Sequence, residues 1–252
     1  MNIAAVRIVS NATAPAPYRR RCLGNFHLNH FSDDVTPQGR KARALISLLA
    51  LTGESVRRER LAGLLWSERD DGQSRASLRT LLYDMRALFG GAAPLLESDR
   101  ASVDLVRTRI VTDLALVDGS IAAANFEAAE SALSGWSGTL FADLDSTDPA
   151  FDEWLAAERA FRHERLVSSL VRALDRALCT DVSPAIRAII TKLAQVEPLN
   201  EIVLRLTLRA DHAVADVSAI HRRYTRFRAL LRAELGAQPS PATQALYAAL
   251  TG

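Results

Sequence analysis

The chain has few of the residues that disulfide-rich, membrane-spanning or secreted proteins need. Its 252 residues include only two cysteines, Cys22 and Cys179, one in each half, so the sequence offers no disulfide framework. No segment approaches the roughly 18 apolar residues of a membrane span. Arg7 interrupts the short apolar stretch at the N-terminus, which argues against a signal peptide. We therefore expect a cytoplasmic protein that does not enter a membrane.

Patterns of catalytic and metal sites are incomplete or missing. Residues 135–139, Gly-Trp-Ser-Gly-Thr, lack the second glycine of a nucleophile elbow at its required position. The acids Asp143, Asp145 and Asp148 lack the glycine and the glutamate of a calcium loop, and the dipole of a helix that begins near Pro149 explains them. A glycine-rich phosphate loop and a receiver pattern are also missing. We expect no enzymatic activity, no cofactor and no metal site.

The charge is unevenly divided along the chain. A length of 252 residues exceeds the usual size of one domain, about 100 to 200 residues. Residues 1–112 hold 17 Arg and Lys against 11 Asp and Glu, a net charge of +6, whereas residues 113–252 hold 14 against 18, a net charge of −4. A basic half suits a polyanionic partner, although this moderate bias alone does not identify one.

The most informative segment, residues 56–89, predicts two helices joined by a tight turn. The first helix covers residues 57–66, the polar residues 67–72 form the turn, and an amphipathic helix covers residues 73–89. At about 100° per residue, the large apolar side chains of the second helix fall in one arc that must be buried. They are Leu78, Leu81, Leu82, Met85, Leu88 and Phe89.

The rest of the second helix is small, polar and basic. Arginines lie along one edge of the apolar arc, and Ala76 and four polar residues face away from the core. A helix in the major groove needs this division, because outward side chains reach base edges while flanking arginines meet phosphates. The alternative is a solvated face, whose charges are usually paired four residues apart, and here only Arg75 has such a partner, Asp71. We therefore expect this helix to contact DNA.

Flanking segments complete a winged helix. Residues 22–30 predict a strand, and residues 36–51 predict a helix that buries Ala42, Leu45, Ile46 and Leu49. Residues 95–97 and 101–106 predict a hairpin, the wing, with Arg100 at its tip. The candidate base contacts are Ser77, Thr80, Tyr83 and Asp84, and the candidate phosphate contacts are Arg75, Arg79, Arg86 and Arg100.

The remaining segments are a short tail and a helical region. We expect residues 1–20 to be a flexible tail, with a strand from Ile3 to Ile8 as an alternative. Three arginines at residues 19–21 form a basic cluster, which is either solvated or lies along a phosphate backbone. Residues 21–112 would form the winged-helix domain, and residues 113–252 a helical domain.

The second half predicts a series of amphipathic helices and no strand. They cover residues 121–133, 149–178, 184–195, 201–214, 217–235 and 241–250. Pairs of helices of this size are typical of a tetratricopeptide-like array, and Ala185-Ile186 recurs 34 residues later as Ala219-Ile220. The predicted fold class is therefore mainly α, a winged helix-turn-helix domain followed by an all-α tetratricopeptide-like domain.

These segments carry a resemblance to a known family. Residues 38–51, 56–66 and 74–88 resemble the winged-helix domain of SARP-type transcriptional activators, whose DNA-binding fold is similar to that of OmpR-type response regulators. The second half resembles the bacterial transcriptional activator domain in several segments that occur in order. These are residues 151–155, 158–159, 197–201, Tyr224, 234–236, Pro239, Pro241 and Thr243. Two segments depart from the family pattern, the second wing strand at residues 101–105 and residues 211–216, which lack the usual glycine of a helix break.

The resemblance implies a sequence-specific transcription activator. Such a protein would bind double-stranded DNA at promoter direct repeats as a homo-oligomer and would contact RNA polymerase. The family motif also has arginines at the positions of Arg79 and Arg86. These two side chains therefore have a second interpretation, in which each one binds a neighbouring carboxylate and stabilises the fold. A competing class is a helical interaction adaptor whose winged helix does not read DNA. The salt dependence of DNA binding separates the two classes.

Overall fold

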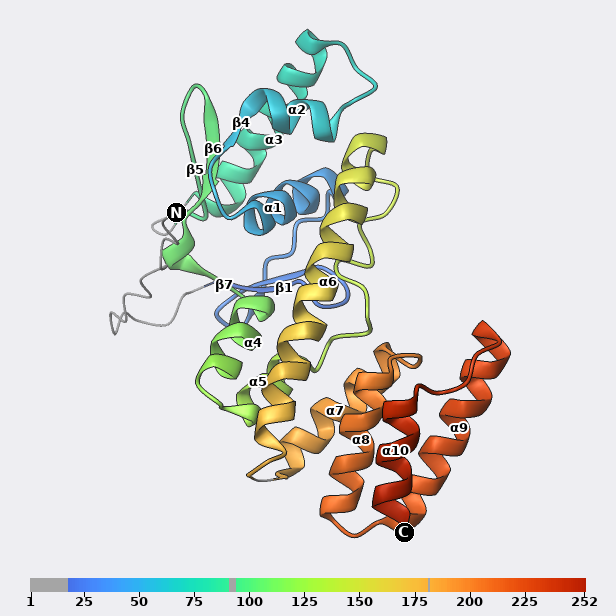
Figure 1. Cartoon of the computed structure of the whole chain (residues 1–252). Helices are drawn as coiled ribbons and strands as arrows, with labels where there is room; N and C mark the ends of the chain where they lie inside the picture. Colours follow the sequence, from blue (N-terminus) through green and yellow to red (C-terminus); the bar gives the residue numbers. More distant parts are fainter. Residues whose placement is uncertain (1–17, 91–93, 181) are drawn as a thin grey trace, which may run out of the picture.

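The computed structural model describes residues 18–90, 94–180 and 182–252. The strands β4 to β6 lie with α2 and α3 at one end of the molecule, and α7 to α10 lie at the other (Figure 1). The long helix α6 runs between the two ends, beside the sheet that contains β1 and β7. The elements predicted as a winged helix are therefore far from the C-terminal helices.

The first sheet joins the start of the described chain to the residues that follow the wing. Its strands, in the order β3-β2-β1-β7, are β1 (Tyr18–Arg21), β2 (His27–His30), β3 (Asp33–Asp34) and β7 (Ile110–Thr112). Strand β1 pairs antiparallel with β2 and parallel with β7. The carboxylate of Asp113, next to β7, accepts hydrogen bonds of 2.9 Å from the backbone N–H groups of Cys22 and Leu23. Segments about 90 residues apart in the sequence are thus held together.

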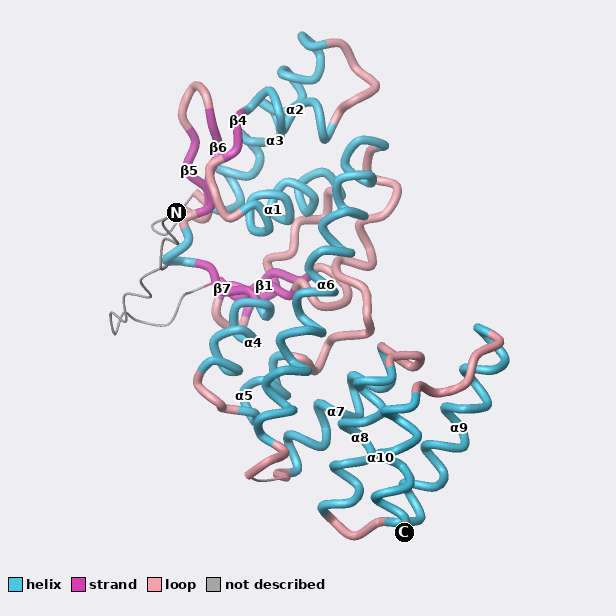
Figure 2. The backbone as a smooth tube through the Cα atoms, viewed as in Figure 1, coloured by secondary structure: helices cyan, strands magenta, loops and turns pink. Residues whose placement is uncertain are grey.

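Three helices and a second sheet form the winged helix. The elements are α1 (Arg40–Thr52), β4 (Val56–Arg57), α2 (Arg58–Leu65), α3 (Asp71–Phe89), β5 (Leu96–Ser98), β6 (Ser102–Leu105) and a short 3₁₀ helix, η1 (Arg107–Arg109). Strand β6 lies between β4 and β5 in an antiparallel sheet, and the β5–β6 hairpin is the wing (Figure 2). The predicted winged helix is confirmed, including a regular strand at the unusual wing sequence of residues 101–105.

The predicted N-terminal tail needs correction at its end. Tyr18 and Arg20 are buried, with 5% and 2% of their surface exposed, because both belong to β1 and pack into the core. Arg20 is therefore not part of a solvated cluster, whereas Arg19 and Arg21 on either side of it are exposed. The rest of the predicted tail, with its alternative strand from Ile3 to Ile8, lies outside the described residues.

Two boundaries upstream of the helix-turn-helix were also wrong. The single strand predicted for residues 22–30 is replaced by a turn after β1 and by β2, because Gly24 reverses the chain with a φ of 94°. A side chain at Gly24 would lie 2.6 Å from the carbonyl oxygen of Gly135, so glycine is required there. The helix predicted from residue 36 begins at Arg40, because the Thr36 hydroxyl accepts a 2.9 Å hydrogen bond from the N–H of Leu28 instead of capping a helix.

The second half is helical, as predicted. Its helices are α4 (Asp113–Ala122), α5 (Phe126–Ala132), α6 (Pro149–Ala177), α7 (Pro184–Val196), α8 (Glu201–Ala213), α9 (Val217–Leu235) and α10 (Pro241–Thr251). The single helix predicted for residues 121–133 is wrong, because Ala124 takes a left-handed φ of 53° and Asn125 caps a new helix. Residues 211–216 do break the helix without a glycine. There Ala215 has a φ of 57° and Asp216 caps α9.

The C-terminal helices pack as successive antiparallel neighbours (Figure 1). The two Ala-Ile pairs noticed in the sequence are buried near the start of α7 and of α9. Both pairs thus serve equivalent packing positions, as a tetratricopeptide-like array requires. The fold is a winged helix followed by an all-α helical domain.

One hydrophobic core runs through both halves, from Tyr18 to Ala210, and a smaller cluster fills the space among α8, α9 and α10. Arg20 lies inside the large core. Its guanidinium carbon is 5.2 Å from the ring centre of Phe26 and 4.5 Å from that of Phe141, and Nη1 donates to the carbonyl oxygen of Ile46 at 3.1 Å. Burial lowers the pKa of Arg20, because water no longer solvates the cation.

We expect Arg20→Met to leave the free energy of unfolding within about 1 kcal/mol of wild type, because a buried cation costs solvation that an apolar side chain of similar volume does not. Nε and Nη2 of Arg20 have no hydrogen-bond partner among the described residues. Arg20→Ala should lose about 2 to 5 kcal/mol, because it opens a cavity between Phe26 and Phe141. Urea unfolding measures both variants. An equal loss in Arg20→Met would show that the guanidinium itself stabilises the fold.

Candidate nucleic-acid interface

Helix α3 begins with a well-defined cap. The Asp70 carboxylate accepts a 2.8 Å hydrogen bond from the backbone N–H of Gln73, and the acid Asp71 occupies the first turn, where the helix dipole favours negative charge. The helix therefore begins at Asp71, two residues before its predicted start, and because α2 ends at Leu65 the turn covers residues 66–70 instead of 67–72.

One face of α3 packs on the core, and one predicted core residue does not. Leu78, Leu82, Met85 and Phe89 are buried, together with Ser74. Leu81 is half-buried. Leu88, predicted to be buried, is 55% exposed. It lies about 80° around the helix from the centre of the buried arc, at the edge of the face that packs on the core. The apolar face is therefore narrower than the sequence pattern suggested.

The predicted contact residues of α3 lie on its outward surface. Arg75, Arg79, Thr80, Tyr83, Asp84 and Arg86 are exposed, and Ser77 is half-buried. Tyr83 exposes 72% of its surface, which is unusual for a large aromatic side chain. Within the described part of the chain, Arg75 and Arg79 form no ion pair, so the expected pair between Arg75 and Asp71 is not present.

Three of these side chains are already engaged within the protein. The Ser77 hydroxyl donates to the carbonyl oxygen of Gln73 at 2.8 Å and accepts from Arg69 at 2.7 Å. The Thr80 hydroxyl donates to the carbonyl oxygen of Ala76 at 3.2 Å. Arg86 donates to the Ser98 hydroxyl of β5 at 2.5 Å. Arg86 therefore holds the wing on α3 through the hydroxyl of Ser98. The second interpretation of this arginine, that it stabilises the fold, had expected a carboxylate as its partner.

The wing ends in a tight turn with an exposed arginine. Oδ1 of Asp99 accepts hydrogen bonds from the backbone N–H groups of Ala101 and Ser102, at 2.7 and 2.6 Å. These two bonds hold the pKa of Asp99 below its usual value. Arg100, next in the chain, is exposed. The tip thus combines a carboxylate held by the turn backbone with a cation that faces solvent.

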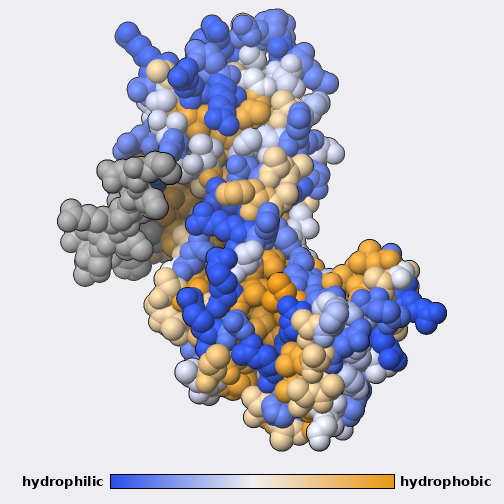
Figure 3. All heavy atoms as spheres, in the orientation of Figure 1, coloured by the Kyte–Doolittle hydropathy of each residue, from blue (hydrophilic) through white to orange (hydrophobic). Residues whose placement is uncertain are grey.

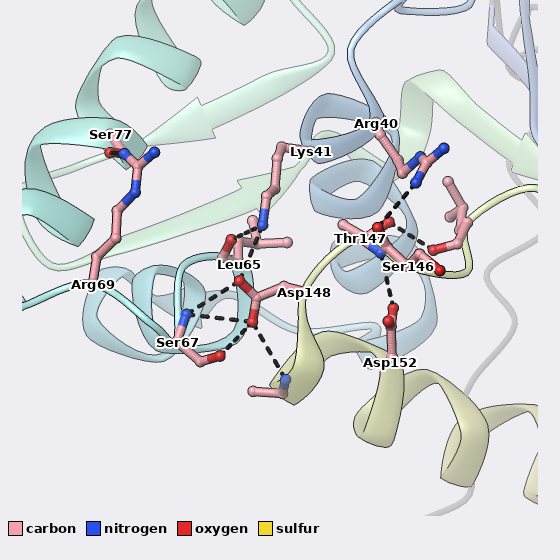
Figure 4. Close-up of polar contacts among 12 residues, drawn as sticks. Arg40, Lys41, Leu65, Ser67, Arg69, Ser77, Ser146, Thr147, Asp148 and Asp152 are labelled. Atoms are coloured by element: carbon pink, nitrogen blue, oxygen red, sulfur yellow. Dashed lines mark hydrogen bonds and ion pairs between the residues drawn. The ribbon is translucent and has the colours of Figure 1, made fainter.

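A carboxylate of the helical half holds the loop that leads into α3. Asp148, at the start of α6, accepts hydrogen bonds from Lys41 Nζ at 3.0 Å, the Ser67 hydroxyl at 2.6 Å and the Ser67 N–H at 3.2 Å. Figure 4 shows its carboxylate pointing toward these groups, with Arg69 and Ser77 further along the same loop and helix. Burial alone would raise the pKa of Asp148, but the hydrogen bonds from Ser67 and Lys41 outweigh it and lower the pKa.

Sequence reasoning missed this connection. It identified Asp148 only as an acid ahead of a helix. Asp148 does cap α6, because its Oδ1 accepts a 3.3 Å hydrogen bond from the N–H of Ala150. Asp143 acts in a similar way, accepting from the N–H of Phe26 at 2.7 Å and pairing with Arg43 at 2.5 Å. No local pattern marks such contacts, since their partners are 80 to 120 residues away.

The surroundings of this interface are polar. The visible surface around the winged-helix end is mainly hydrophilic, whereas the lower part of the molecule shows larger apolar areas (Figure 3).

Among residues 18–90, 94–180 and 182–252, no cluster of three or more His, Cys, Asp and Glu is arranged to bind a metal ion. None of the helices in these ranges has the length and hydropathy of a membrane span.

Comparison with known proteins assigns the family. The model of the bacterial transcriptional activator domain matches residues 103–251, more than half of the chain. The chain belongs to this family. The activator-domain family is one of transcription regulators rather than enzymes, and the resemblance to SARP-type activators is confirmed.

Two relatives of this activator-domain chain bear the name transcriptional regulatory protein MoaR1. They come from Mycobacterium bovis (strain BCG / Pasteur 1173P2) and Mycobacterium tuberculosis (strain ATCC 25618 / H37Rv). Each is 25% identical over 260 residues, which cover 95% of this chain and 81% of MoaR1. Both relatives support a role in transcription regulation.

The fold is similar to that of Mycobacterium tuberculosis EmbR, solved in complex with a low affinity phosphopeptide. The TM-score is 0.66 at 22% identity over 93% of this chain. The chain spans 65% of the EmbR chain. The likeness confirms the combination of a winged helix with a helical domain.

Proposed function

We propose that this transcription regulator is an activator that binds double-stranded DNA in a sequence-specific manner, with α3 in the major groove. The observation that carries the proposal is the outward face of α3, where Arg75 and Arg79 are exposed and unpaired within the described chain beside small and aromatic residues. Side chains on such a face can reach base edges while the flanking arginines meet phosphate oxygens. Family membership and the MoaR1 relatives support regulation of transcription.

Individual roles follow from position. On this proposal the base edges are contacted from the outward side of α3, and phosphates are contacted from its arginine edge and from the wing. The candidates are Ser77, Thr80, Tyr83 and Asp84 for bases, and Arg75, Arg79, Arg86 and Arg100 for phosphates. Arg86 would have to exchange its bond to Ser98 for a phosphate, so Arg75 and Arg79 are the stronger phosphate candidates.

The helical half would serve assembly and recruitment. We propose that copies of the chain occupy direct repeats at a promoter in the cytoplasm and that the bound protein contacts RNA polymerase. The division into a DNA-binding domain that ends near residue 112 and a helical domain that begins near residue 113 stays a prediction. The shared core and the hydrogen bonds from the N–H groups of Cys22 and Leu23 to Asp113 indicate that the two parts form a connected unit.

The decisive experiment is selection from random duplex DNA by the purified full-length chain. Enrichment of a defined motif, with tighter binding to two direct copies than to one, is the expected result. Failure to enrich any sequence at low salt would favour the competing class, an interaction adaptor whose winged helix does not read DNA. The full chain is used because Asp113 and β7 complete the first sheet and one hydrophobic core runs through both halves.

Arg75→Ala is expected to weaken DNA binding at every sequence and to lower the salt slope. Each phosphate contact contributes about 0.9 to the slope of log K against log salt, so the variant should lose about one unit. Binding measured between about 50 and 200 mM salt gives the slope. Arg226→Ala, which removes the same exposed charge from α9 at the other end of the molecule, is the matched control. An unchanged slope in Arg75→Ala would remove this residue from the phosphate set.

A further inference from the structure

The residues directly opposite the buried face of α3 form a distinct line. The buried face is centred on Leu78, between Ser74 and Leu82. At about 100° per residue, the opposite side of the helix carries side chains that are all exposed. They are Gln73, Ala76, Thr80, Tyr83 and Ala87. This outer line is the part of α3 that would enter deepest into a groove.

The outer line offers methyl groups, one aromatic ring and one amide. Ala76 presents a methyl group, and Thr80 uses its hydroxyl on the carbonyl oxygen of Ala76, which leaves its own methyl group for a partner. Tyr83 adds an exposed ring. Gln73 carries the amide, which is exposed and forms no side-chain hydrogen bond within the described residues, although its backbone N–H and carbonyl are both engaged.

The outer line lacks the side chains that recognise guanine. Arginine and lysine pair with guanine O6 and N7, and here Arg75, Arg79 and Arg86 lie about 80 to 120° from the centre of the line, at the edge of the helix. Glutamine pairs with adenine N6 and N7, and methyl groups contact the C5-methyl group of thymine. The chemistry of the outer line therefore matches A·T base pairs.

We propose that α3 reads A·T base pairs, with Gln73 bound to adenine and Ala76, Thr80 and Tyr83 packed against thymine methyl groups. The proposal rests on the proposed function and specifies its target. From Gln73 to Tyr83 the helix advances about 15 Å, which matches four to five base-pair steps of about 3.4 Å. The N-terminal position of Gln73 is where recognition helices contact base edges.

A helix that reads A·T pairs in this way has a different set of base contacts from the one predicted. Thr80 and Tyr83 remain, and Gln73 and Ala76 are added. Ser77 lies off the line, and its hydroxyl is held by Gln73 and Arg69. Asp84 also lies off the line, on the side away from the arginines. Both residues are therefore placed at the rim of the contact, outside the base-reading line.

The methyl contacts are tested with duplexes in which single thymines of the selected operator are replaced by uracil, which removes only the C5-methyl group. We expect the wild-type chain to lose about fourfold in affinity at each contacted thymine, the value of one buried methyl group. Thr80→Ser, which lacks the methyl group and keeps the hydroxyl, should bind thymine and uracil equally at its position. Thr80→Val, which keeps the methyl group, is the matched control and should still discriminate.

The adenine contact is tested by repeating the selection with variants of Gln73. Gln73→Ala should bind the wild-type operator about tenfold more weakly and should accept any base at one adenine position. Gln73→Glu should prefer cytosine there, because a carboxylate accepts a hydrogen bond from cytosine N4. Position 73 is the third residue of α3, where glutamate is favourable, so the variant should fold.

The outcomes separate this inference from the function on which it rests. A specific operator that the wild-type chain binds equally with thymine or uracil at every position, or an unchanged base preference in Gln73→Glu, would overturn the reading of A·T pairs and leave sequence-specific binding intact. An absence of any selected operator would overturn the proposed function instead.

Discussion

Asp148→Ala is expected to lower the free energy of unfolding by about 3 kcal/mol, and Asp148→Asn by about half as much. Alanine removes the cap of α6, which costs about 1 kcal/mol. It also leaves Lys41 with only the carbonyl oxygen of Leu65 as a partner and the N–H of Ser67 without an acceptor, which costs about 1 to 3 kcal/mol. Asparagine retains a neutral acceptor for the N–H of Ala150 and loses the charge that pairs with Lys41. Urea unfolding at pH 7 measures the series.

The pH dependence of the Asp148→Asn effect gives an independent check. The pKa of Asp148 is lower in the folded chain than its ordinary value, so ionisation of this carboxyl stabilises the fold. That stability is present in full above the unfolded pKa of about 3.9 and is lost as the pH falls through the lower folded pKa. The difference between wild type and Asp148→Asn should therefore shrink in acid, whereas a constant difference down to about pH 2.5 would contradict the assigned ion pair. The pKa of Glu201 is also lowered, but Glu201 is present in both proteins, so its contribution to the pH dependence cancels in the difference.

Elements with strong local signals were predictable from the sequence. Apolar periodicity identified α2, α3 and the helices from α6 onward, and capping residues explain where α3 and α6 to α9 begin. The caps are Asp70, Asp148, Ser183, Asn200 and Asp216, each of which accepts a hydrogen bond from a backbone N–H of its helix. Boundaries set by such local bonds depend on a few consecutive residues, although the start of α3 was predicted two residues too late.

The first sheet was not predictable, because part of its pairing joins residues far apart in the sequence. Strand β1 (Tyr18–Arg21) lies between the nearby β2 and the distant β7 (Ile110–Thr112), which follows about 90 residues later. Its sequence of three consecutive arginines suggests a solvated cluster, and only the rings of Phe26 and Phe141 explain why Arg20 is buried. A partner so far along the chain leaves no local pattern.

The candidate interface was predictable in outline. The helical period alone separates the buried face of α3 from its arginine edge, and the structure places all of these arginines at the surface. Hydroxyl contacts are a different matter, because the bonds of Ser77 and Thr80 to the helix backbone depend on side-chain geometry. Gln73 was missed since it stands at the predicted start of the helix and was not assigned to a face.

The contacts of Asp148 connect the helical half to the loop that leads into α3. The helical half holds Ser67, and two residues later Arg69 donates to Ser77 on α3. Displacement of α6 would therefore disturb the loop that positions the proposed DNA-reading helix.

Ala76→Asp is expected to abolish sequence-specific DNA binding without unfolding the protein. Ala76 is exposed at the centre of the outer line of α3, so an aspartate there would place a negative charge against the bases and phosphates of a docked duplex. Like charges brought together in an interface cost several kcal/mol, which corresponds to a loss of at least about 100-fold in affinity. The cost to the helix itself is at most about 0.7 kcal/mol. Binding to the selected operator, measured beside thermal unfolding, gives both quantities.

Ala229→Asp is the matched control for this variant. Ala229 is an exposed residue of α9, so the substitution makes the same change in charge and in helix propensity at the opposite end of the molecule. Because α9 lies far from α3, the control should bind the operator within about twofold of wild type. Equal losses in the two variants would trace the effect to net charge. Wild-type affinity in Ala76→Asp would show that the duplex docks on another face, and the assignment of α3 as the reading helix would then be wrong.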